Sequence, residues 1–489
     1  MMLVMACKQV PDMLRFCRSG MGRCLGMLVL SALGLHAAAV EGPAPPARVV
    51  AEHQQIEGPF ADGIDVTDTC LECHEETARD VMQTSHWTWS RKQDVVDRGW
   101  MDTGKRHAVN NFCYGVASNL SKCTECHVGY GWKDDSFDFD NPSNVDCLVC
   151  HDTTGTYRRI GGDGGVADPA TDFEHVARNV GMPSRANCGS CHFYGGGAHG
   201  VKHGDLERAL VDGDANIDVH MAADGLNYAC QSCHVTQRHR IPGTTMAASP
   251  AGTDVVACTD CHAGEIHAKK ILDHHALSIA CQTCHVPHFA KAQATKLYWD
   301  WSAAGERRQT EVREDGQPVY EPHKGRFRWG RNVVPEYAWF NGKAGVHAWG
   351  DKIDVDKELR LNWPVGDKAD KAARIYPFKL HRGRQIYDSG HRYLVNPHLV
   401  TEDGFAYTLD WAKAAELGMQ ARGLAYSGKF DFVDSVMFLR INHMVAPAAQ
   451  SLGCKDCHGP AQTRMNWRKL GYDADPLYES GQARYPIAR

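Results

Sequence analysis

The chain has 489 residues, of which 43% are hydrophobic and 23% are charged, and its formal net charge is -6. Residues 1–39 hold four basic residues and one acidic residue, so the rest of the chain carries -9. An acidic chain of this kind is not expected to bind nucleic acid. The mean hydropathy of -0.42 and the 47 glycines indicate a loop-rich protein without a large aliphatic core.

The N-terminus has the pattern of an export signal. A region with four basic residues precedes the apolar run Cys24–Val40, and Ala37-x-Ala39 suits a signal peptidase. An uncleaved membrane anchor is the alternative, but the run is shorter than the roughly 20 residues that span a bilayer. We therefore predict a signal peptide over 1–39, a periplasmic protein without a stable membrane span after cleavage, and a flexible Pro/Ala-rich lead-in over 40–62.

The pattern Cys-x-x-Cys-His occurs eight times in the rest of the chain. It is the attachment signature of c-type haem, in which two cysteines form thioethers to the porphyrin and the adjacent His binds the iron. The predicted attachment cysteines are Cys70 and Cys73, Cys123 and Cys126, Cys147 and Cys150, Cys188 and Cys191, Cys230 and Cys233, Cys258 and Cys261, Cys281 and Cys284, and Cys454 and Cys457. The predicted iron ligands beside them are His74, His127, His151, His192, His234, His262, His285 and His458.

Zinc binding is the competing interpretation of these cysteines. A structural zinc site needs two Cys-x-x-Cys pairs for one metal, and the position of any His varies. Here a His directly follows all eight pairs, which zinc geometry does not require. The sequence therefore predicts eight covalently attached haem c groups.

The spacing of the motifs sets the expected architecture. Seven motifs fall within a predicted haem core over 63–289, an aromatic-rich region without motifs over 290–440 is predicted to form a cap, and the eighth motif lies in 441–489. We expect a mostly α fold with extensive loops wrapped around the haems, little β structure and no layered core. Helical character is expected around 75–89, and further helices are predicted over 366–374, 408–419 with Thr408 as a possible N-cap, and 431–442.

Low-spin haems need a second axial ligand, which is usually a His. Seven His residues stand at suggestive distances from the motifs, and the alternative for each of them is a surface or core His without iron. The predicted distal ligands are His86, His203, His220, His239, His267, His275 and His443, with His175, His274 and His288 as reserves. Seven ligands for eight haems leave one haem as a candidate catalytic centre.

Two residues outside the motifs are further candidates for the functional site. Cys113 is the one cysteine outside both the motifs and the predicted signal, and it lies ten residues before Cys123. Lys202 stands in a glycine-rich loop that begins at Gly195. An inert buried thiol and a solvated loop Lys are the simpler interpretations of these two residues.

These features resemble the octahaem c-type cytochromes of the tetrathionate reductase family. The resemblance covers nearly the whole mature chain. It rests on the eight motifs with the last one distant, and on Asn110-x-x-Cys113, Val201-Lys202-His203-Gly204-Asp205, Asp218-Val219-His220-Met221 and Ile375-Tyr376-Pro377-Phe378-Lys379. The resemblance implies that the haem on Cys123 and Cys126 is the active one. It implies Lys202 as the distal ligand of that haem, with Cys113 and Asn110 in its active site.

The chemistry of these groups agrees with a reductase that cleaves sulfur–sulfur bonds. A Lys that binds iron must be neutral, and a thiol near a cationic centre is pushed toward the nucleophilic thiolate. Attack on the central S–S bond of tetrathionate would be thiol–disulfide exchange that releases thiosulfate. The expected partners are a small anionic substrate and an electron-donor cytochrome or quinol dehydrogenase.

Two other functions fit the motif count. One is reduction of nitrite or hydroxylamine, or oxidation of hydroxylamine, although the Cys-x-x-Cys-Lys motif that often marks nitrite reductases is absent from the sequence. The other is a non-catalytic multihaem electron carrier, in which every haem would have two protein ligands. Binding of an added ligand to one haem would distinguish the enzymes from the carrier.

Overall fold

The computed structural model describes residues 51–112, 115–462 and 464–478. The predicted signal peptide, the first part of the lead-in and Cys113 lie outside the described residues. No helix in the described part of the chain is both apolar enough and long enough to span a bilayer. The predicted domain boundaries stay predictions.

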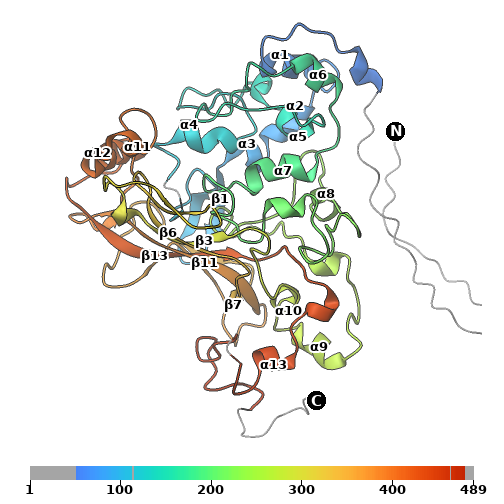
Figure 1. Cartoon of the computed structure of the whole chain (residues 1–489), viewed down its shortest axis with the longest axis vertical. Coiled ribbons are helices and arrows are strands. Elements are labelled where there is room, and N and C mark those ends of the chain that lie inside the picture. The colour runs from blue at the N-terminus through green and yellow to red at the C-terminus, as the bar shows by residue number, and fades with distance from the viewer. Residues whose placement is uncertain (1–50, 113–114, 463, 479–489) are drawn as a thin grey trace, which may run out of the picture. The chain divides into compact units, whose positions relative to one another are not determined.

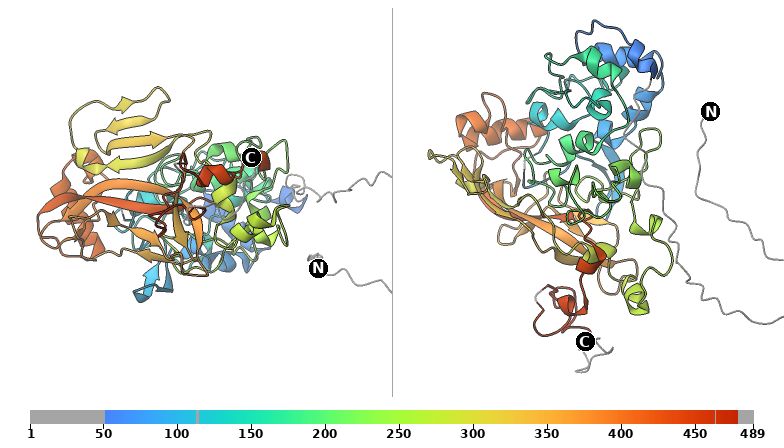
Figure 2. Two further views of the ribbon diagram at one scale, coloured as in Figure 1. Left: turned by 90° about the horizontal axis from the view of Figure 1, so that it is seen from below. Right: turned by 45° about the vertical axis from the view of Figure 1, so that its right-hand side comes forward.

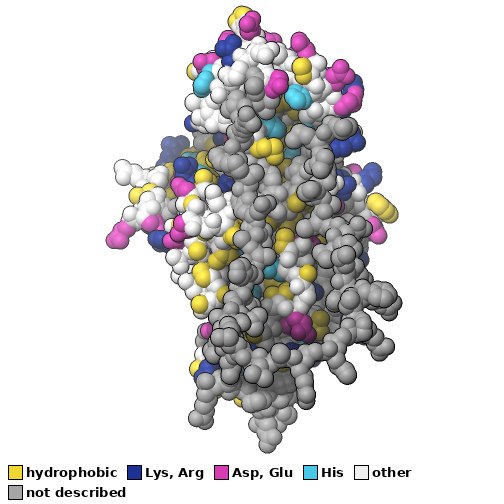
Figure 3. Space-filling view, turned by 90° about the vertical axis from the view of Figure 1, so that its right-hand side faces the viewer, with side chains coloured by type: hydrophobic (Ala, Val, Ile, Leu, Met, Phe, Trp, Pro, Cys, Tyr) yellow, Lys and Arg dark blue, Asp and Glu magenta, His cyan; other side chains and the backbone are white. Residues whose placement is uncertain are grey.

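The first half of the chain forms short helices joined by long loops (Figure 1). Most of the Cys-x-x-Cys-His motifs lie on or next to such a helix. Acidic side chains lie at the end of the structure that α1 occupies (Figure 3). The α-helices are α1 Gly63–Leu71, α2 Thr77–Met82, α3 Ser85–Thr88, α4 Leu120–Cys123, α5 Leu148–His151, α6 Phe173–Arg178, α7 Arg185–His192, α8 Cys230–Cys233, α9 Lys270–His275, α10 Cys281–His285, α11 Phe405–Thr408, α12 Trp411–Arg422 and α13 Cys454–Cys457. The 3-10 helices are η1 Ala51–Gln55, η2 Thr124–Cys126, η3 Pro142–Asn144, η4 Arg208–Leu210, η5 Cys258–Asp260, η6 Trp301–Ala303 and η7 Ala448–Gln450.

The second half of the chain builds a nine-stranded mixed sheet beside this helical part (Figures 1 and 2). The strand order is β4-β5-β6-β3-β11-β13-β9, and β7 and β12 also pair with β11. The pairs β11–β3 and β13–β9 are parallel, and the other pairs are antiparallel. The strands of this sheet are β3 Thr295–Asp300, β4 Glu311–Val312, β5 Pro318–Glu321, β6 Gly325–Gly330, β7 Glu336–Phe340, β9 Leu359–Arg360, β11 Arg374–Asp388, β12 Tyr393–Leu394 and β13 Phe430–Arg440. Two small sheets pair β1 Arg91–Val95 with β2 Gly99–Thr103, and β8 Ala344–Val346 with β10 Asn362–Pro364.

The expected fold class is therefore wrong in its secondary structure. The protein is 23% helical and 19% strand, and it contains a large mixed sheet rather than little β structure. The expectation assumed that haems replace most of the protein core. The region 290–440 instead has its own apolar interior, rich in aromatic residues that favour strands.

Two of the predicted helices are also wrong. Residues 366–374 form turns that lead into β11, and the predicted helix over 431–442 falls mostly on β13. The Val and Phe residues of β13 give it high strand propensity, and its pairing with β11 along eleven positions outweighs the helical appearance of the local sequence. The third predicted helix is observed as α12, whose N-cap is Asp410 rather than Thr408. The helical character near residues 75–89 is observed as α2 and α3.

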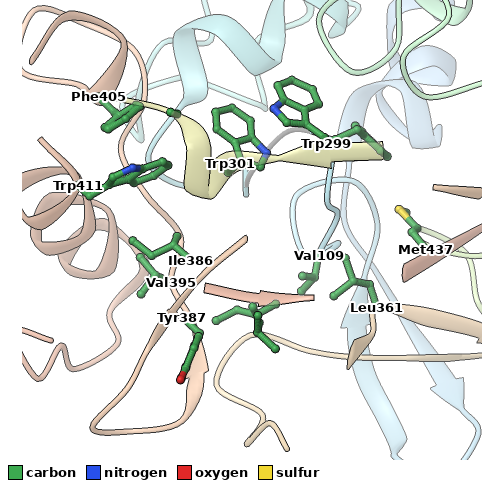
Figure 4. Close-up of a cluster of buried hydrophobic side chains, with 14 of the residues drawn as sticks. Val109, Trp299, Trp301, Leu361, Ile386, Tyr387, Val395, Phe405, Trp411 and Met437 are labelled. Atoms are coloured by element: carbon green, nitrogen blue, oxygen red, sulfur yellow. The ribbon is translucent and has the colours of Figure 1, made fainter. Parts of the chain in front are cut away.

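The sheet packs against α11 and α12 through a cluster of aromatic residues (Figure 4). Trp299 and Trp301 stack with ring centres 4.5 Å apart, and Phe405 stacks on Trp411 at 3.8 Å. Val109, from the loop that leads toward Cys113, is buried in the same cluster. The cluster thus anchors that loop to the sheet.

A buried ion pair holds the segment around the third motif. Asp146 is fully buried and accepts hydrogen bonds from the hydroxyls of Tyr130 and Tyr157, and Arg159 forms a short ion pair with it. Replacing Asp146 with Asn leaves Arg159 as a buried charge without its counterion. We expect Asp146→Asn to lower the free energy of unfolding by about 3–5 kcal/mol. Denaturant unfolding measures this, with the exposed Asp138→Asn as control; an equal loss in both variants would contradict the expectation.

Candidate functional site

Seven pairs of His rings lie at one nearly constant separation. Each pair joins a motif His to a His from another part of the chain. The ring centres are 6.3 Å apart in His53–His74, 6.2 Å in His86–His192, 6.3 Å in His151–His239, 6.1 Å in His220–His262, 6.3 Å in His234–His443, 6.2 Å in His267–His285 and 6.4 Å in His275–His458.

This separation fits a metal ion between two imidazoles. Two rings that bind one metal from opposite sides, each at about 2 Å, have their centres roughly 6 Å apart. The carboxylates and carbonyls that orient several rings leave Nε2 turned toward the gap. For example, His458 Nδ1 lies 2.7 Å from Asp475 Oδ1, and His151 Nδ1 lies 2.7 Å from the Gly181 carbonyl. The residues present therefore fit covalently attached haem with two His ligands at seven of the eight motifs.

The structure brings six of the seven sequence-predicted distal His residues opposite a motif His. The exception is His203, which has no other His ring beside it within the described chain. His203 is held next to Lys202, and its pKa is well below the usual value because it is buried and faces the Lys202 ammonium. The reserve His175 instead lies on α6 beside Asn179.

His53 is the seventh His that faces a motif His, and the sequence pattern did not predict it. It lies on η1, in the segment predicted to be a flexible lead-in. The signal that was available is its position in Glu52-His53-Gln54-Gln55, a short helix-forming run 17 residues before Cys70. Contacts of this run with α6, such as the hydrogen bond from Gln54 Nε2 to the Arg178 carbonyl at 2.8 Å, fix it beside the first motif.

His53 gives a spectroscopic prediction. His53→Ala should convert one haem from the low-spin to the high-spin state, because its iron loses one of two strong imidazole ligands. Electron paramagnetic resonance of the oxidised protein measures this change. His175→Ala, an exposed His on the neighbouring α6, is the matched control and should leave all haems unchanged. A fully low-spin His53 variant would contradict the assignment.

His127 differs from the other seven motif His residues. It is fully buried, and its Nε2 lies 2.8 Å from the backbone carbonyl of Trp87. Five aromatic rings surround it with ring centres 4.8–6.0 Å away, from Trp87, Trp89, Trp132, Phe137 and Phe139. Among the described residues no other His ring faces His127, whereas one faces each of the other seven motif His residues. The role of His127 as the iron ligand of the second motif stays a prediction.

Lys202 is a half-buried Lys near this second motif. Its Nζ lies 5.9 Å from the ring centre of Phe112, the residue before Cys113. Burial lowers the pKa of Lys202 to about 8, and the charge of Lys105 adds to the effect. A second Lys, Lys105, reaches the same motif, with its Nζ 3.5 Å from the Cys123 carbonyl oxygen. The amine of Lys202 can therefore be neutral near pH 8, as a metal ligand must be.

The loop that carries Lys202 is fixed from two sides. Gly196 has φ +85°, and a Cβ there would lie 2.7 Å from Val201 Cγ1 and 3.0 Å from Phe112 Cδ2, so only glycine fits. From the sheet, the buried Lys379 of β11 donates to the carbonyls of Val201 and Lys202 at 2.8 and 2.9 Å. It also donates to Thr295 Oγ1 at 2.7 Å. These contacts hold Lys202 in one backbone position.

β11 also fixes the loop that leads to Cys113. Asn111 Nδ2 donates to the His381 carbonyl at 2.7 Å, and its Oδ1 lies 2.8 Å from His381 Nδ1. The ring of His381 lies 5.9 Å from that of Phe112, and its Nε2 is buried without a partner among the described residues. Asn110, the residue before Asn111, is half-buried. The sheet, which the sequence did not predict, thus places both loops of the candidate active site.

Contacts between attachment cysteines give the order of the motifs in space. Cys70 contacts Cys147, Cys150 interacts with Cys188, Cys188 contacts Cys230, Cys233 interacts with Cys261, Cys258 contacts Cys281, and Cys284 interacts with Cys454. Cys126 contacts Cys191. The motifs therefore follow the path 1-3-4-5-6-7-8, and the second motif branches from the fourth.

Known proteins resemble both halves of the chain. The family described as Cytochrome c554 and c-prime matches residues 69–152, and the family described as Cytochrome c bacterial matches 296–461. An uncharacterised protein of Archaeoglobus fulgidus is 23% identical over 265 residues, which cover 44% of this chain and 88% of that protein.

A solved structure gives a wider match. The crystal structure of octahaem cytochrome c from Shewanella oneidensis superposes with a TM-score of 0.84 at 45% sequence identity. The match covers 89% of this chain and 100% of the other. Together with the eight attachment motifs and the seven facing His pairs, this similarity shows that the chain belongs to the multihaem c-type cytochromes.

Proposed function

We propose that this cytochrome is an exported, periplasmic oxidoreductase that reduces tetrathionate to thiosulfate at its second motif. The observation that carries the proposal is the exceptional environment of that motif. No second His faces its His127 among the described residues, and the half-buried Lys202 lies near Cys126 of the same motif. In a pure electron carrier, every haem is expected to have two His ligands, as the other seven motifs do. A second motif without a His pair is therefore expected of an enzyme.

When a haem is bound at this motif, His127 and Lys202 would hold its iron, which is the ligand pair that the sequence resemblance implies. A Lys amine that is held less firmly than an imidazole would give way to a substrate. Lys379 and Gly196 act as positioning residues, because they fix the backbone of the Lys202 loop.

The reaction uses the thiol of Cys113, which lies outside the described residues. Its sequence neighbour Phe112 packs near Lys202, and the positive charge of Lys105 favours a thiolate and an anionic substrate. The Cys113 thiolate attacks the central S–S bond, releases one thiosulfate and forms a Cys113–S–S bond to the other half. Two electrons then cleave this bond, which frees the second thiosulfate and restores the thiolate. The haems, when bound, supply these electrons.

The order of the motifs supports electron delivery to this site. The second motif lies on a branch from the fourth, and the fourth lies within the path between motifs 1 and 8. Haems held by these motifs would therefore offer a route from either end of the path to the branch. The proposed donor is a cytochrome or a quinol dehydrogenase.

The direct test is oxidation of reduced viologen by tetrathionate, nitrite and hydroxylamine with the haem-loaded protein. Tetrathionate should turn over with the release of two thiosulfates for each pair of electrons. Faster turnover of nitrite or hydroxylamine would indicate that a nitrogen compound, and not tetrathionate, is the substrate at the same haem. No turnover of any of the three would overturn the enzymatic proposal in favour of an electron carrier.

A further inference from the structure

The segment around the first motif is strongly acidic. Residues 51–80 contain nine Asp and Glu residues and one basic residue, Arg79, which gives -8 in 30 residues. The chain after residue 39 carries -9, so this short segment accounts for most of its net charge. Figure 3 shows acidic side chains gathered at the end of the described structure where α1 lies.

Most of these carboxylates face solvent without a counterion. Asp68, Glu72 and Glu75 are exposed, and none of the three forms an ion pair with another described residue. The helix α6 that packs against η1 adds Glu174, which is paired with Arg178. The surface therefore keeps a negative potential that solvent and salt alone screen.

This acidic surface surrounds a terminal redox site. Cys73 and His74 of the first motif are both exposed, and Cys70 of this motif contacts Cys147 of the third motif. The eighth motif, at the other end of the path, has a different surface. Residues 448–478 hold four basic and three acidic residues, so the two ends of the path differ sharply in charge.

We propose that the acidic surface formed by Asp68, Glu72 and Glu75 around the first motif docks a basic c-type cytochrome that exchanges electrons with the haem there. Charge complementarity identifies the partner: a small redox protein whose own haem edge is ringed by Lys residues. The identity of this partner as an electron donor rests on the proposed function, since a reductase must be supplied with electrons. The docking itself is independent of the substrate.

Electrostatics sets the expected behaviour. Opposite potentials on two redox proteins accelerate their encounter, by about 10- to 1,000-fold, and the gain falls as salt is added. Neutralising rim charges mainly lowers the association rate and its salt dependence. The acidic end should therefore give fast, salt-sensitive electron transfer with a basic cytochrome.

The test compares two charge-matched variants of the full haem-loaded protein. One is Asp68→Asn/Glu72→Gln/Glu75→Gln. The control is Asp224→Asn/Glu314→Gln/Glu402→Gln, which removes the same charge from exposed positions elsewhere. Stopped-flow measures electron transfer from the dithionite-reduced protein to a basic monohaem cytochrome c, and titration calorimetry measures its affinity. The same cytochrome with succinylated lysines is the second probe, and haem content checks the folding of each variant.

We expect the first variant to lower the second-order rate and the affinity by about tenfold at low salt, and to flatten the salt dependence. The control should stay within about twofold of the wild type, and the succinylated cytochrome should bind neither variant nor wild type. Equal effects of the two variants, or unchanged binding of the succinylated probe, would overturn the proposal. Viologen-driven turnover of the wild type tests the reductase function separately, because a small dye needs no docking surface.

Discussion

Lys202→Ala is expected to lower tetrathionate turnover by about 100-fold or more and to change the spectrum of one haem. The physical reason is the loss of the nitrogen ligand assigned to the second motif. Misplacement of a reacting centre by about 1 Å already lowers the rate of an enzyme by about 100-fold. Near-infrared magnetic circular dichroism reports the axial ligands of each low-spin haem, and steady-state viologen oxidation reports the turnover.

Lys122→Ala is the matched control for this variant. Lys122 is a partly exposed Lys beside Cys123 that pairs with Glu125, so its removal changes the charge near the motif but not the assigned ligand. This control should retain normal turnover and spectra. A Lys202 variant with the wild-type spectrum would contradict the assignment, whatever its activity.

Cys113→Ala is expected to reduce tetrathionate turnover by at least about 1,000-fold, because removal of a covalent nucleophile abolishes the exchange step. Hydroxylamine turnover should stay within about twofold, since that substrate needs no thiol. The two activities are measured with the same viologen assay on one preparation. Equal losses of both activities would indicate that Cys113 supports the structure of the site rather than reacting with the substrate.

The haem sites could be predicted largely from sequence because their pattern is local. The eight motifs need only adjacent residues, and six distal His residues were found by their distance from a motif. His53 was missed because the segment around it has a Pro-rich neighbourhood typical of a linker, whereas contacts with α6 order it. His203 was chosen by the same distance argument, but its neighbour Lys202 and the hydrogen bonds of Lys379 hold the loop near the second motif instead.

The sheet could not be predicted by the same means. β11 pairs with β3, β7, β12 and β13, and the residues that β3 and β11 bring together, such as Tyr298 and Arg382, are 84 positions apart along the chain. Such contacts are not encoded in a local pattern, and the Lys and Ala residues before Arg374 favour a helix when considered alone. The environment of His127 was hidden for a similar reason, because its hydrogen bond to the Trp87 carbonyl joins residues 40 positions apart.

The central claim is that Lys202 is the second ligand beside His127 at the second motif. The most direct measurement is the near-infrared magnetic circular dichroism of the oxidised haem-loaded wild-type protein, because the charge-transfer bands of a low-spin haem depend on its axial ligands. The account predicts seven haems with two imidazole ligands and one haem with an imidazole and an amine ligand. A spectrum in which every haem has two imidazole ligands would contradict it.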